Sequence, residues 1–260
     1  MDLKGLTKEQ LQALGLNEQQ IEAILGAATA NSKTGGLPFP LLKINFDMDF
    51  GKVGAWAYNP QKDDDGTITG YEKIYDPTIK VRFLKSMYQY SKYDSAEGKP
   101  TITSNIFELK DAKKAYDLKT GTLISQLKDM DDGIKFQRIL LGVIEDGDER
   151  KPFILYAKGS FLFELNDILR KFPNDAHLTH ILELGTKKNK KGTVVWFTPT
   201  LVNSEELDQA EFLKRVKEDA ELISKFNEWV EQVNSGGEND NSTTQTQVDD
   251  MEEDEDNIEF

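Results

Sequence analysis

The sequence predicts a mainly β protein built around one antiparallel barrel or sandwich. Apolar and polar residues alternate with a period of two through most of 43–200, which is typical of strands with one buried face. The alternating runs are short and separated by Gly- and Asp-rich turns, whereas a parallel βαβ sheet needs a helix between strands. A chain of 260 residues is long enough for one large domain with flanking segments.

The clearest alternating run extends from Ile44 to Phe50, with its apolar residues on one face and its polar residues on the other. Similar runs are found at 53–58, 71–75, 79–84, 101–107, 134–144, 152–157 and 193–198. A helix is expected at 160–171, between Ser160 and Pro173. The predicted central domain occupies 37–203.

The segment before this domain, 1–36, is predicted to form a helical hairpin and a linker. Thr7 and Gln10 have the spacing of a capping box, and Asn17 is suited to cap a second helix that contains Ile21 and Ile24. Residues 31–36 are rich in small polar residues and glycine, which is typical of a linker.

The segment after the central domain, 204–234, is predicted to be a long amphipathic helix. Its apolar residues recur at helical spacing from Phe212 to Val233, and Ser204 is a candidate N-cap. We expect this helix to pack on the barrel or on a second copy of the chain. Residues 235–260 carry too few apolar side chains to offset the entropy of ordering them, so they are predicted to form a disordered tail.

The formal net charge of -14 is distributed unevenly along the chain. Residues 235–260 hold ten acidic and no basic side chains, so the remainder carries only -4 and has room for a basic face. The absence of cysteine excludes disulfides, thiolate metal sites and a cysteine nucleophile. No apolar run approaches 20 residues and the first residues lack the pattern of a signal peptide, so a cytoplasmic protein is expected.

Aromatic and basic residues interleave in and before the block 71–93, which is the first candidate site. Bases of an unpaired strand stack on aromatic rings while Lys and Arg pair with its phosphates. The alternative is that the rings belong to the core and that the lysines only solvate the sheet. The candidate nucleic-acid-binding residues are Trp56, Tyr58, Tyr71, Lys73, Tyr75, Lys80, Arg82, Tyr88, Tyr90 and Lys92.

A second candidate site is a lysine-rich hairpin tip between the apolar runs 181–184 and 193–197. Such a tip can close over a bound strand and neutralise phosphates, although a solubilising loop on an acidic protein has the same composition. Its residues are Lys187, Lys188, Lys190 and Lys191.

The third candidate is the acidic terminus, which ends in Asn257-Ile258-Glu259-Phe260. An aliphatic residue two places before a terminal phenylalanine provides an apolar anchor and a free carboxylate, which a basic-rimmed pocket can bind. The candidate partner-binding residues are Asp254, Glu255, Asp256, Ile258 and Phe260.

This terminus resembles the tails of bacterial and phage-encoded single-stranded DNA-binding proteins. The resemblance covers about the last dozen residues, together with the order of globular core, polar linker and acidic tip. Glu259 stands where bacterial tails carry proline, and the length of the chain fits a phage-encoded type, which would act in the cytoplasm of its host.

The resemblance implies an OB fold, a five-stranded barrel, here with insertions. It also implies a protein that coats and protects single-stranded DNA during replication, recombination and repair. The tail would recruit a polymerase, helicase or recombinase. No catalytic activity, cofactor or metal is implied, and a homo-oligomer is possible.

Two other classes of protein remain open. The first is an interaction or chaperone-like protein that does not bind DNA and whose acidic tail binds a basic partner. The second is a metal-dependent nuclease that uses Asp47 and Asp49, although strand alternation alone explains their spacing. His177 and His180 also have a ligand-like spacing but lack a nearby Glu or Cys pattern, so surface histidines are expected.

Overall fold

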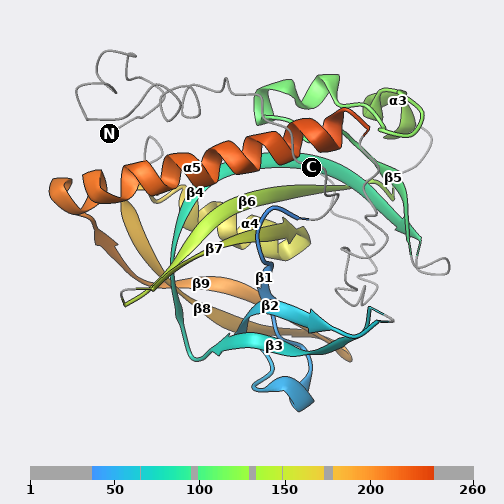
Figure 1. The fold of residues 1–260 in the computed structure, drawn as a ribbon. Coiled ribbons are helices and arrows are strands. Elements are labelled where there is room, and N and C mark those ends of the chain that lie inside the picture. Colours follow the sequence, from blue (N-terminus) through green and yellow to red (C-terminus); the bar gives the residue numbers. More distant parts are fainter. Residues whose placement is uncertain are drawn as a thin grey trace, which may run out of the picture.

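In the computed structural model, residues 37–64, 66–94, 99–128, 133–147, 149–172 and 178–236 are described. They form two antiparallel sheets, which confirms the prediction of a mainly β protein (Figure 1). The smaller sheet has the order β1-β2-β3, with β1 Leu42–Ile44, β2 Trp56–Lys62 and β3 Ile68–Tyr75. The larger sheet has the order β7-β6-β4-β8-β9, and β5 also pairs with β4. Its strands are β4 Ile79–Asp94, β5 Lys99–Thr103, β6 Lys135–Asp146, β7 Glu149–Lys158, β8 His180–Lys191 and β9 Val194–Glu206.

Within the described residues, three α-helices and two short 3-10 helices accompany the sheets. They are η2 Met48–Phe50, η3 Leu109–Lys114, α3 Ile124–Lys128, α4 Gly159–Leu169 and α5 Gln209–Asn234. The predicted helix at 160–171 is α4, and the predicted C-terminal helix is α5. Among the described residues, no helix combines the length and the apolar character that crossing a membrane requires.

Strand β4 organises the larger sheet because it pairs with three different neighbours, β5, β6 and β8. Its first residues, from Ile79 to Val81, pair with β8, and most of its length pairs with β6. The register with β6 shifts between Phe83 and Lys85, and such a bulge bends a strand. Figure 1 shows β4 curving over the molecule before it reaches β5. The two sheets are joined by a bridge between Leu41 and Ile154, and they do not close into one continuous barrel.

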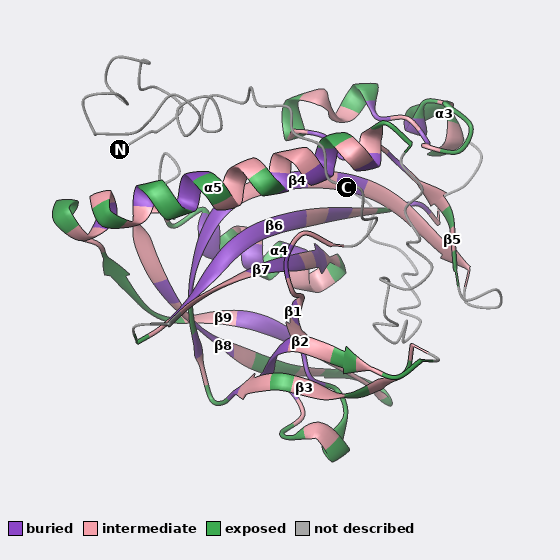
Figure 2. Ribbon diagram, in the orientation of Figure 1, coloured by how far each residue is buried: buried purple, intermediate pink, exposed green. Residues whose placement is uncertain are grey.

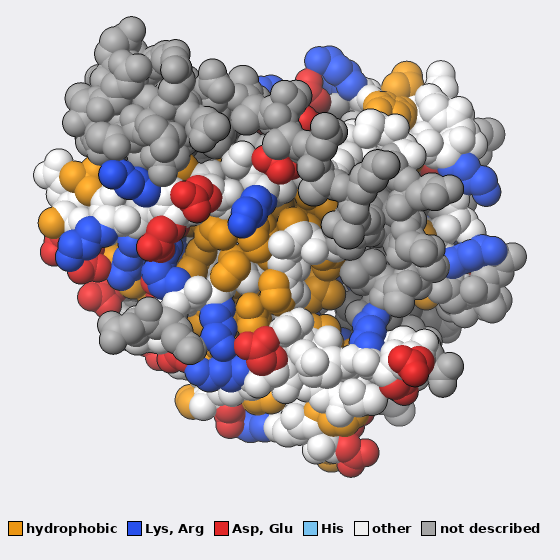
Figure 3. All heavy atoms as spheres, in the orientation of Figure 1, with side chains coloured by type: hydrophobic (Ala, Val, Ile, Leu, Met, Phe, Trp, Pro, Cys, Tyr) orange, Lys and Arg blue, Asp and Glu red, His pale blue; other side chains and the backbone are white. Residues whose placement is uncertain are grey.

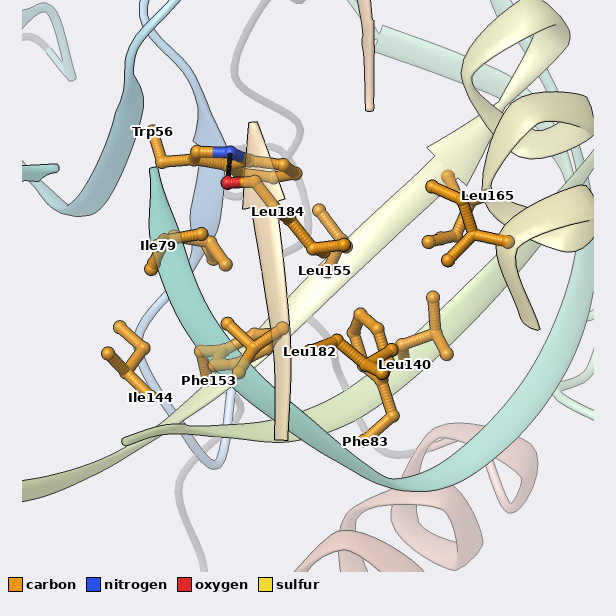
Figure 4. Close-up of a cluster of buried hydrophobic side chains, with 14 of the residues drawn as sticks. Trp56, Ile79, Phe83, Leu140, Ile144, Phe153, Leu155, Leu165, Leu182 and Leu184 are labelled. Carbon is orange, nitrogen blue, oxygen red and sulfur yellow. Dashed lines mark hydrogen bonds between the residues drawn. The ribbon is translucent and has the colours of Figure 1, made fainter. Parts of the chain in front are cut away.

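The main core lies between the two sheets and α4. Its buried side chains come from β1, β2, β3, β4, β6, β7, β8 and α4 (Figure 4). Trp56 is fully buried there, and its indole Nε1 donates to the backbone carbonyl of Leu184 at 3.1 Å. Because a buried indole N–H needs an acceptor, this bond fixes where β2 lies against β8.

Helix α5 covers the outer face of β4, β6 and β7. Phe226, Trp229, Val230 and Val233 on the helix belong to the same buried cluster as Leu141 and Val143 on β6. Figure 2 shows buried, intermediate and exposed residues alternating along α5. In Figure 3, hydrophobic side chains gather below α5, while acidic and basic side chains alternate along the helix. The amphipathic pattern therefore predicted the packing face correctly.

The start of α5 differs from the prediction. Asp208, and not Ser204, caps the helix by accepting a hydrogen bond from the backbone N–H of Glu211 at 2.8 Å. Ser204 instead belongs to β9, where it pairs with Leu182. Helix propensity is a weak local preference, and pairing with β8 overrides it here.

The run from Ile44 to Phe50 is likewise not a continuous strand. Strand β1 ends at Ile44, and residues 48–50 form the short helix η2. The buried Asn45 side chain donates to the carbonyls of Asp47 and Lys52, which turns the chain into a loop. The predicted N-terminal helical hairpin and the predicted disordered tail, apart from Ser235 and Gly236, lie outside the described residues.

Candidate nucleic-acid interface

The candidate rings on β2 and β3 contribute to the core. Trp56 pairs with Tyr75 across the two strands, and both side chains are buried in the main core. Tyr58 is also buried, and its hydroxyl donates to the carbonyl of Pro152 at 3.3 Å. Burial, assisted by the negative charge of Glu72, raises the pKa of Tyr58 to about 12. In this structure none of these three rings has an open face on which a base could stack.

Tyr71 and Lys73 lie nearer the surface on β3. The Tyr71 ring is half-buried and meets Phe50 edge-on at 6.1 Å between ring centroids. Lys73 forms an ion pair with Asp146, and this hydrogen bond raises the pKa of Lys73. Because Lys73 already has a carboxylate partner, it is a weaker candidate for phosphate binding than an unpaired lysine.

Lys80 and Arg82 occupy different environments although they lie two residues apart on β4. Lys80 is exposed. Arg82 is buried, and its guanidinium contacts Glu145 on β6 and both carboxylate oxygens of Asp219 on α5, the latter at 2.8 and 3.0 Å. The prediction that Arg82 neutralises phosphates therefore disagrees with the structure, because its charge is already compensated in the interior.

Half-buried rings and cations meet where the far part of β4 lies beside β6. Tyr88 stacks on Phe136 with 5.3 Å between centroids and an interplanar angle of 11°, and Tyr90 lies 5.0 Å from Phe136. The Arg138 guanidinium lies 5.6 Å from the centre of the Tyr88 ring, and Lys128 Nζ lies 4.2 Å from that of Tyr90. We call these five residues the ring patch.

Neighbouring side chains hold the ring patch in place. Arg138 donates from Nε and Nη2 to Ser86 Oγ at 3.0 and 2.6 Å, and from Nη1 to Asn166 Oδ1 on α4 at 2.7 Å. One turn before Asn166 on α4, Phe163 is 69% exposed. Residues three apart on a helix are neighbours, so Phe163 is an exposed ring on the side of α4 that carries Asn166, the partner of Arg138. Burial raises the pKa of Tyr90 and lowers the pKa of Lys128.

Lys92, the remaining candidate on β4, is half-buried and pairs in register with Ile102 on β5. It is two residues beyond Tyr90 on the same strand. The structure thus brings together Tyr88, Tyr90 and Lys92 and separates them from the candidates on β2 and β3.

The lysine-rich segment is the end of β8, next to the turn into β9 at Gly192 and Thr193, and β8 and β9 form the predicted hairpin. Lys187, Lys188, Lys190 and Lys191 are all exposed. Within the described part of the chain, none of the four forms an ion pair or a hydrogen bond through its ammonium group. In β9, Trp196 and Phe197 are half-buried and pair in register with Asn189 and Lys188 respectively. Four unpaired cations beside two rings can bind a polyanion that carries flat bases.

Other candidate sites have structural explanations or lie outside the described residues. The Asp47 carboxylate caps η2 by accepting from the backbone N–H of Asp49 at 2.8 Å. No three acidic or histidine side chains gather into a possible metal site in the ranges that the structure describes. His177 lies outside those ranges, as do the partner-binding candidates Asp254, Glu255, Asp256, Ile258 and Phe260.

Sequence reasoning missed Phe136, Arg138, Lys128 and Phe163. Phe136 and Arg138 are two residues apart in the predicted strand 134–144, so their shared face was readable from the sequence. Their position beside Tyr88 depends on the pairing of β4 with β6, which no local pattern specifies.

Comparisons with known proteins add no relationship to these observations. No protein-family model matches the chain, and neither a curated protein nor a solved structure matches it.

Proposed function

We propose that this protein binds single-stranded DNA and has no catalytic role. The observation that carries the proposal is the ring patch, where half-buried aromatic rings and two cations lie together at the surface. Bases stacked on such rings contribute about 1–3 kcal/mol each, and the stacking needs base faces that a duplex keeps covered. The lysine tip supplies the complementary phosphate contacts.

The order of the strands supports an OB-type barrel with insertions. An OB fold is a five-stranded, partly open barrel that binds oligonucleotides on its second and third strands and with the loops after its first and fourth strands. If β4, β6, β7, β8 and β9 are those five strands, the lysine tip is the end of the fourth strand, next to the loop that follows it. The ring patch then lies beside the long connection after the first strand.

Helix α5 explains why the proposed binding surfaces lie away from the outer face of the second and third strands. It covers the outer face of β6 and β7, the second and third strands of this assignment, through Trp229, Val230 and their neighbours. The ring patch and the lysine tip are two surfaces with rings and cations that this helix does not cover. A strand held there would be shielded from nucleases and kept from pairing.

The acidic tail fits the same proposal as a hook for partners. Ile258 and Phe260 would bind a polymerase, helicase or recombinase, and the tail's carboxylates would keep that segment away from DNA-like polyanions. Single-stranded DNA and these replication proteins are the proposed partners, with action in replication, recombination and repair.

The test is binding of fluorescent oligo-dT to the full chain by anisotropy. Phe163→Ala and Lys128→Gln should each weaken binding, because one removes an exposed ring and the other a cation at the patch. The controls Leu109→Ala and Lys217→Gln remove an exposed apolar side chain and an exposed lysine elsewhere. Absence of oligo-dT binding by the unaltered protein overturns the proposed function. Binding that both patch variants retain in full moves the site away from the ring patch.

A further inference from the structure

The loop between β1 and β2 presents two apolar side chains from a rigid frame. Phe46 is 39% exposed and Met48 is 83% exposed. Beneath them, Asn45 is fully buried and donates to the carbonyls of Asp47 and Lys52, while its Oδ1 accepts from the backbone N–H of Asp47. Hydrogen bonds on both sides of Asn45 fix the path of the loop. The exposure of Phe46 is therefore built into the loop.

Phe46 is held against a ring of the β8–β9 hairpin. It meets Phe197 edge-on, with 5.8 Å between ring centroids and an interplanar angle of 68°. Phe197 in turn lies over Gly54, where a Cβ atom would come within 2.4 Å of the ring and where φ is +89°. Thr186 Oγ1 also donates to the carbonyl of Gly54 at 2.6 Å. Gly54 thus allows the hairpin to approach the loop and support Phe46.

Two of the unpaired lysines share the face of the hairpin that carries Phe197. Lys188 is directly opposite Phe197 in the register, and Lys190 is opposite Val195, two residues further along each strand. Directly opposed residues of an antiparallel pair point to the same side, and so do residues two apart on one strand. Phe46, Phe197, Lys188 and Lys190 therefore form one surface of rings and cations.

We propose that this surface is a second base-stacking site for single-stranded nucleic acid, separate from the ring patch. A base covers the exposed face of Phe46, Phe197 supports that ring from its edge, and Lys188 and Lys190 bind the flanking phosphates. Asp49, exposed on the same loop, repels phosphates, so the backbone of the strand follows the lysines. This inference rests on the proposed function and extends it from one stacking surface to two.

Folding alone gives no reason for this arrangement. An exposed phenylalanine contributes little to the core, and a loop that only connected two strands would not need the buried Asn45 network to hold Phe46 outward. The lysines, being unpaired within the described residues, contribute no ion pair to stability. A bound single strand would use the exposed Phe46 ring for base stacking and the lysines for phosphate pairing.

The experiment separates stacking from phosphate binding. The full chain is titrated with oligo-dT and with an abasic oligonucleotide of the same length and charge. Phe46→Ala should weaken oligo-dT binding by about 5- to 150-fold, the range for one lost base stack, and leave abasic binding unchanged. Lys188→Gln with Lys190→Gln should weaken both ligands and reduce the slope of log K against log salt by roughly 0.7 per lysine.

Leu109→Ala and Lys217→Gln are the matched controls, and circular dichroism confirms that each variant is folded. If Phe46→Ala leaves the preference for oligo-dT over the abasic strand unchanged, the second stacking site is refuted while the proposed function stands. If the unaltered protein binds neither oligonucleotide, the proposed function itself fails. Equal weakening of both ligands by Phe46→Ala also overturns the inference, because it indicates a structural role.

Discussion

Arg82 lies in a network of buried charges that joins three strands to α5. Its guanidinium contacts Glu145 and Asp219, and Asp219 also accepts from Arg150 at 2.6 Å. Arg215 on the helix lies 3.3 Å from Glu145. Removing one partner from such a network leaves an uncompensated charge in the interior.

We therefore expect Arg82→Met to lower the free energy of unfolding by about 3–5 kcal/mol. Lys80→Ala, two residues earlier on an exposed site, should change it by no more than about 0.5 kcal/mol. Urea denaturation of both variants measures the difference. Equal stability of the two variants would show that the network adds nothing.

Glu72 gives a second residue-scale prediction, this time about pH. Its carboxylate accepts from Asn59 Nδ2 at 2.7 Å and from Lys151 Nζ at 2.9 Å, and these hydrogen bonds lower the pKa of Glu72 below its ordinary value of 4.5. A carboxyl group with a lowered folded-state pKa stabilises the fold above its unfolded pKa, and that contribution is lost as the pH falls through the folded value.

Glu72→Gln should thus destabilise the protein by up to about 1 kcal/mol at pH 7, as expected for an exposed pair. The difference from the unaltered protein should shrink as the pH falls below 4.5. Thermal unfolding across this pH range is the measurement, with Glu205→Gln as an exposed control on β9. A difference that stays constant with pH would contradict the assignment.

At the scale of elements, α5 stabilises the sheet by covering its outer face. Phe226 and Trp229 lie 5.6 Å apart between ring centroids and pack against β6. Asn234, the last residue of the helix, accepts from the N–H of Ile106 and donates to its carbonyl, which anchors the end of α5 beside β5.

Trp229→Ala should lower the free energy of unfolding by about 3–5 kcal/mol, because it removes a large buried side chain and leaves a cavity. Lys225→Ala, on the exposed side of the same helix, is the matched control. Guanidinium denaturation measures both, and ANS fluorescence reports whether the outer face of β6 becomes accessible. Two variants of equal stability would mean that α5 is only loosely associated.

Local patterns predicted the elements better than their ends or partners. Alternation indicated β4, β5, β6, β7 and β9, although it ended β4 at residue 84 and did not mark β8 as a strand, and helical spacing identified α5. Alternation failed at Ile44–Phe50, where the Asn45 side chain replaces backbone pairing. The N-cap prediction failed at Ser204, where pairing with β8 extends β9. Both failures reflect contacts that are distant in sequence or made by side chains, which a period of two cannot encode.

The candidate site was predicted only in part, because local patterns do not show which face of a strand is covered. Rings and cations on alternating strands look alike whether they face solvent or the interior. Trp56 and Arg82 turned out buried because α4, α5 and the second sheet cover them, whereas Tyr88 and Lys188 lie at surfaces those elements leave open. Which face is covered depends on how the sheets pack together.

At the scale of the whole molecule, the two ring-and-cation surfaces lie on different parts of one curved sheet. In Figure 1 the far ends of β4 and β5 curve to the right above, and the β8–β9 hairpin extends to the right below. Helix α4 touches β6, β7 and β9 and so connects the two regions. One strand of nucleic acid that contacts both surfaces would run between the far ends of β4 and β5 and the β8–β9 hairpin.

The three tryptophans allow this arrangement to be tested without labels. Trp56 is fully buried and Trp229 is buried between α5 and the sheet, so neither can meet a base, whereas Trp196 is half-buried on the hairpin. Trp196 pairs with Asn189, and Lys187 and Lys191 lie on the same face of the ribbon by alternation.

Oligo-dT should therefore quench the intrinsic fluorescence through Trp196, and a duplex should quench it much less at moderate salt. Trp196→Phe should abolish the quenching while anisotropy still detects binding, and Trp56→Phe should retain it. Undiminished quenching in Trp196→Phe, or equal quenching by duplex and oligo-dT, would rule out base contact on the face of the hairpin that carries Trp196, which is opposite the face of Phe197.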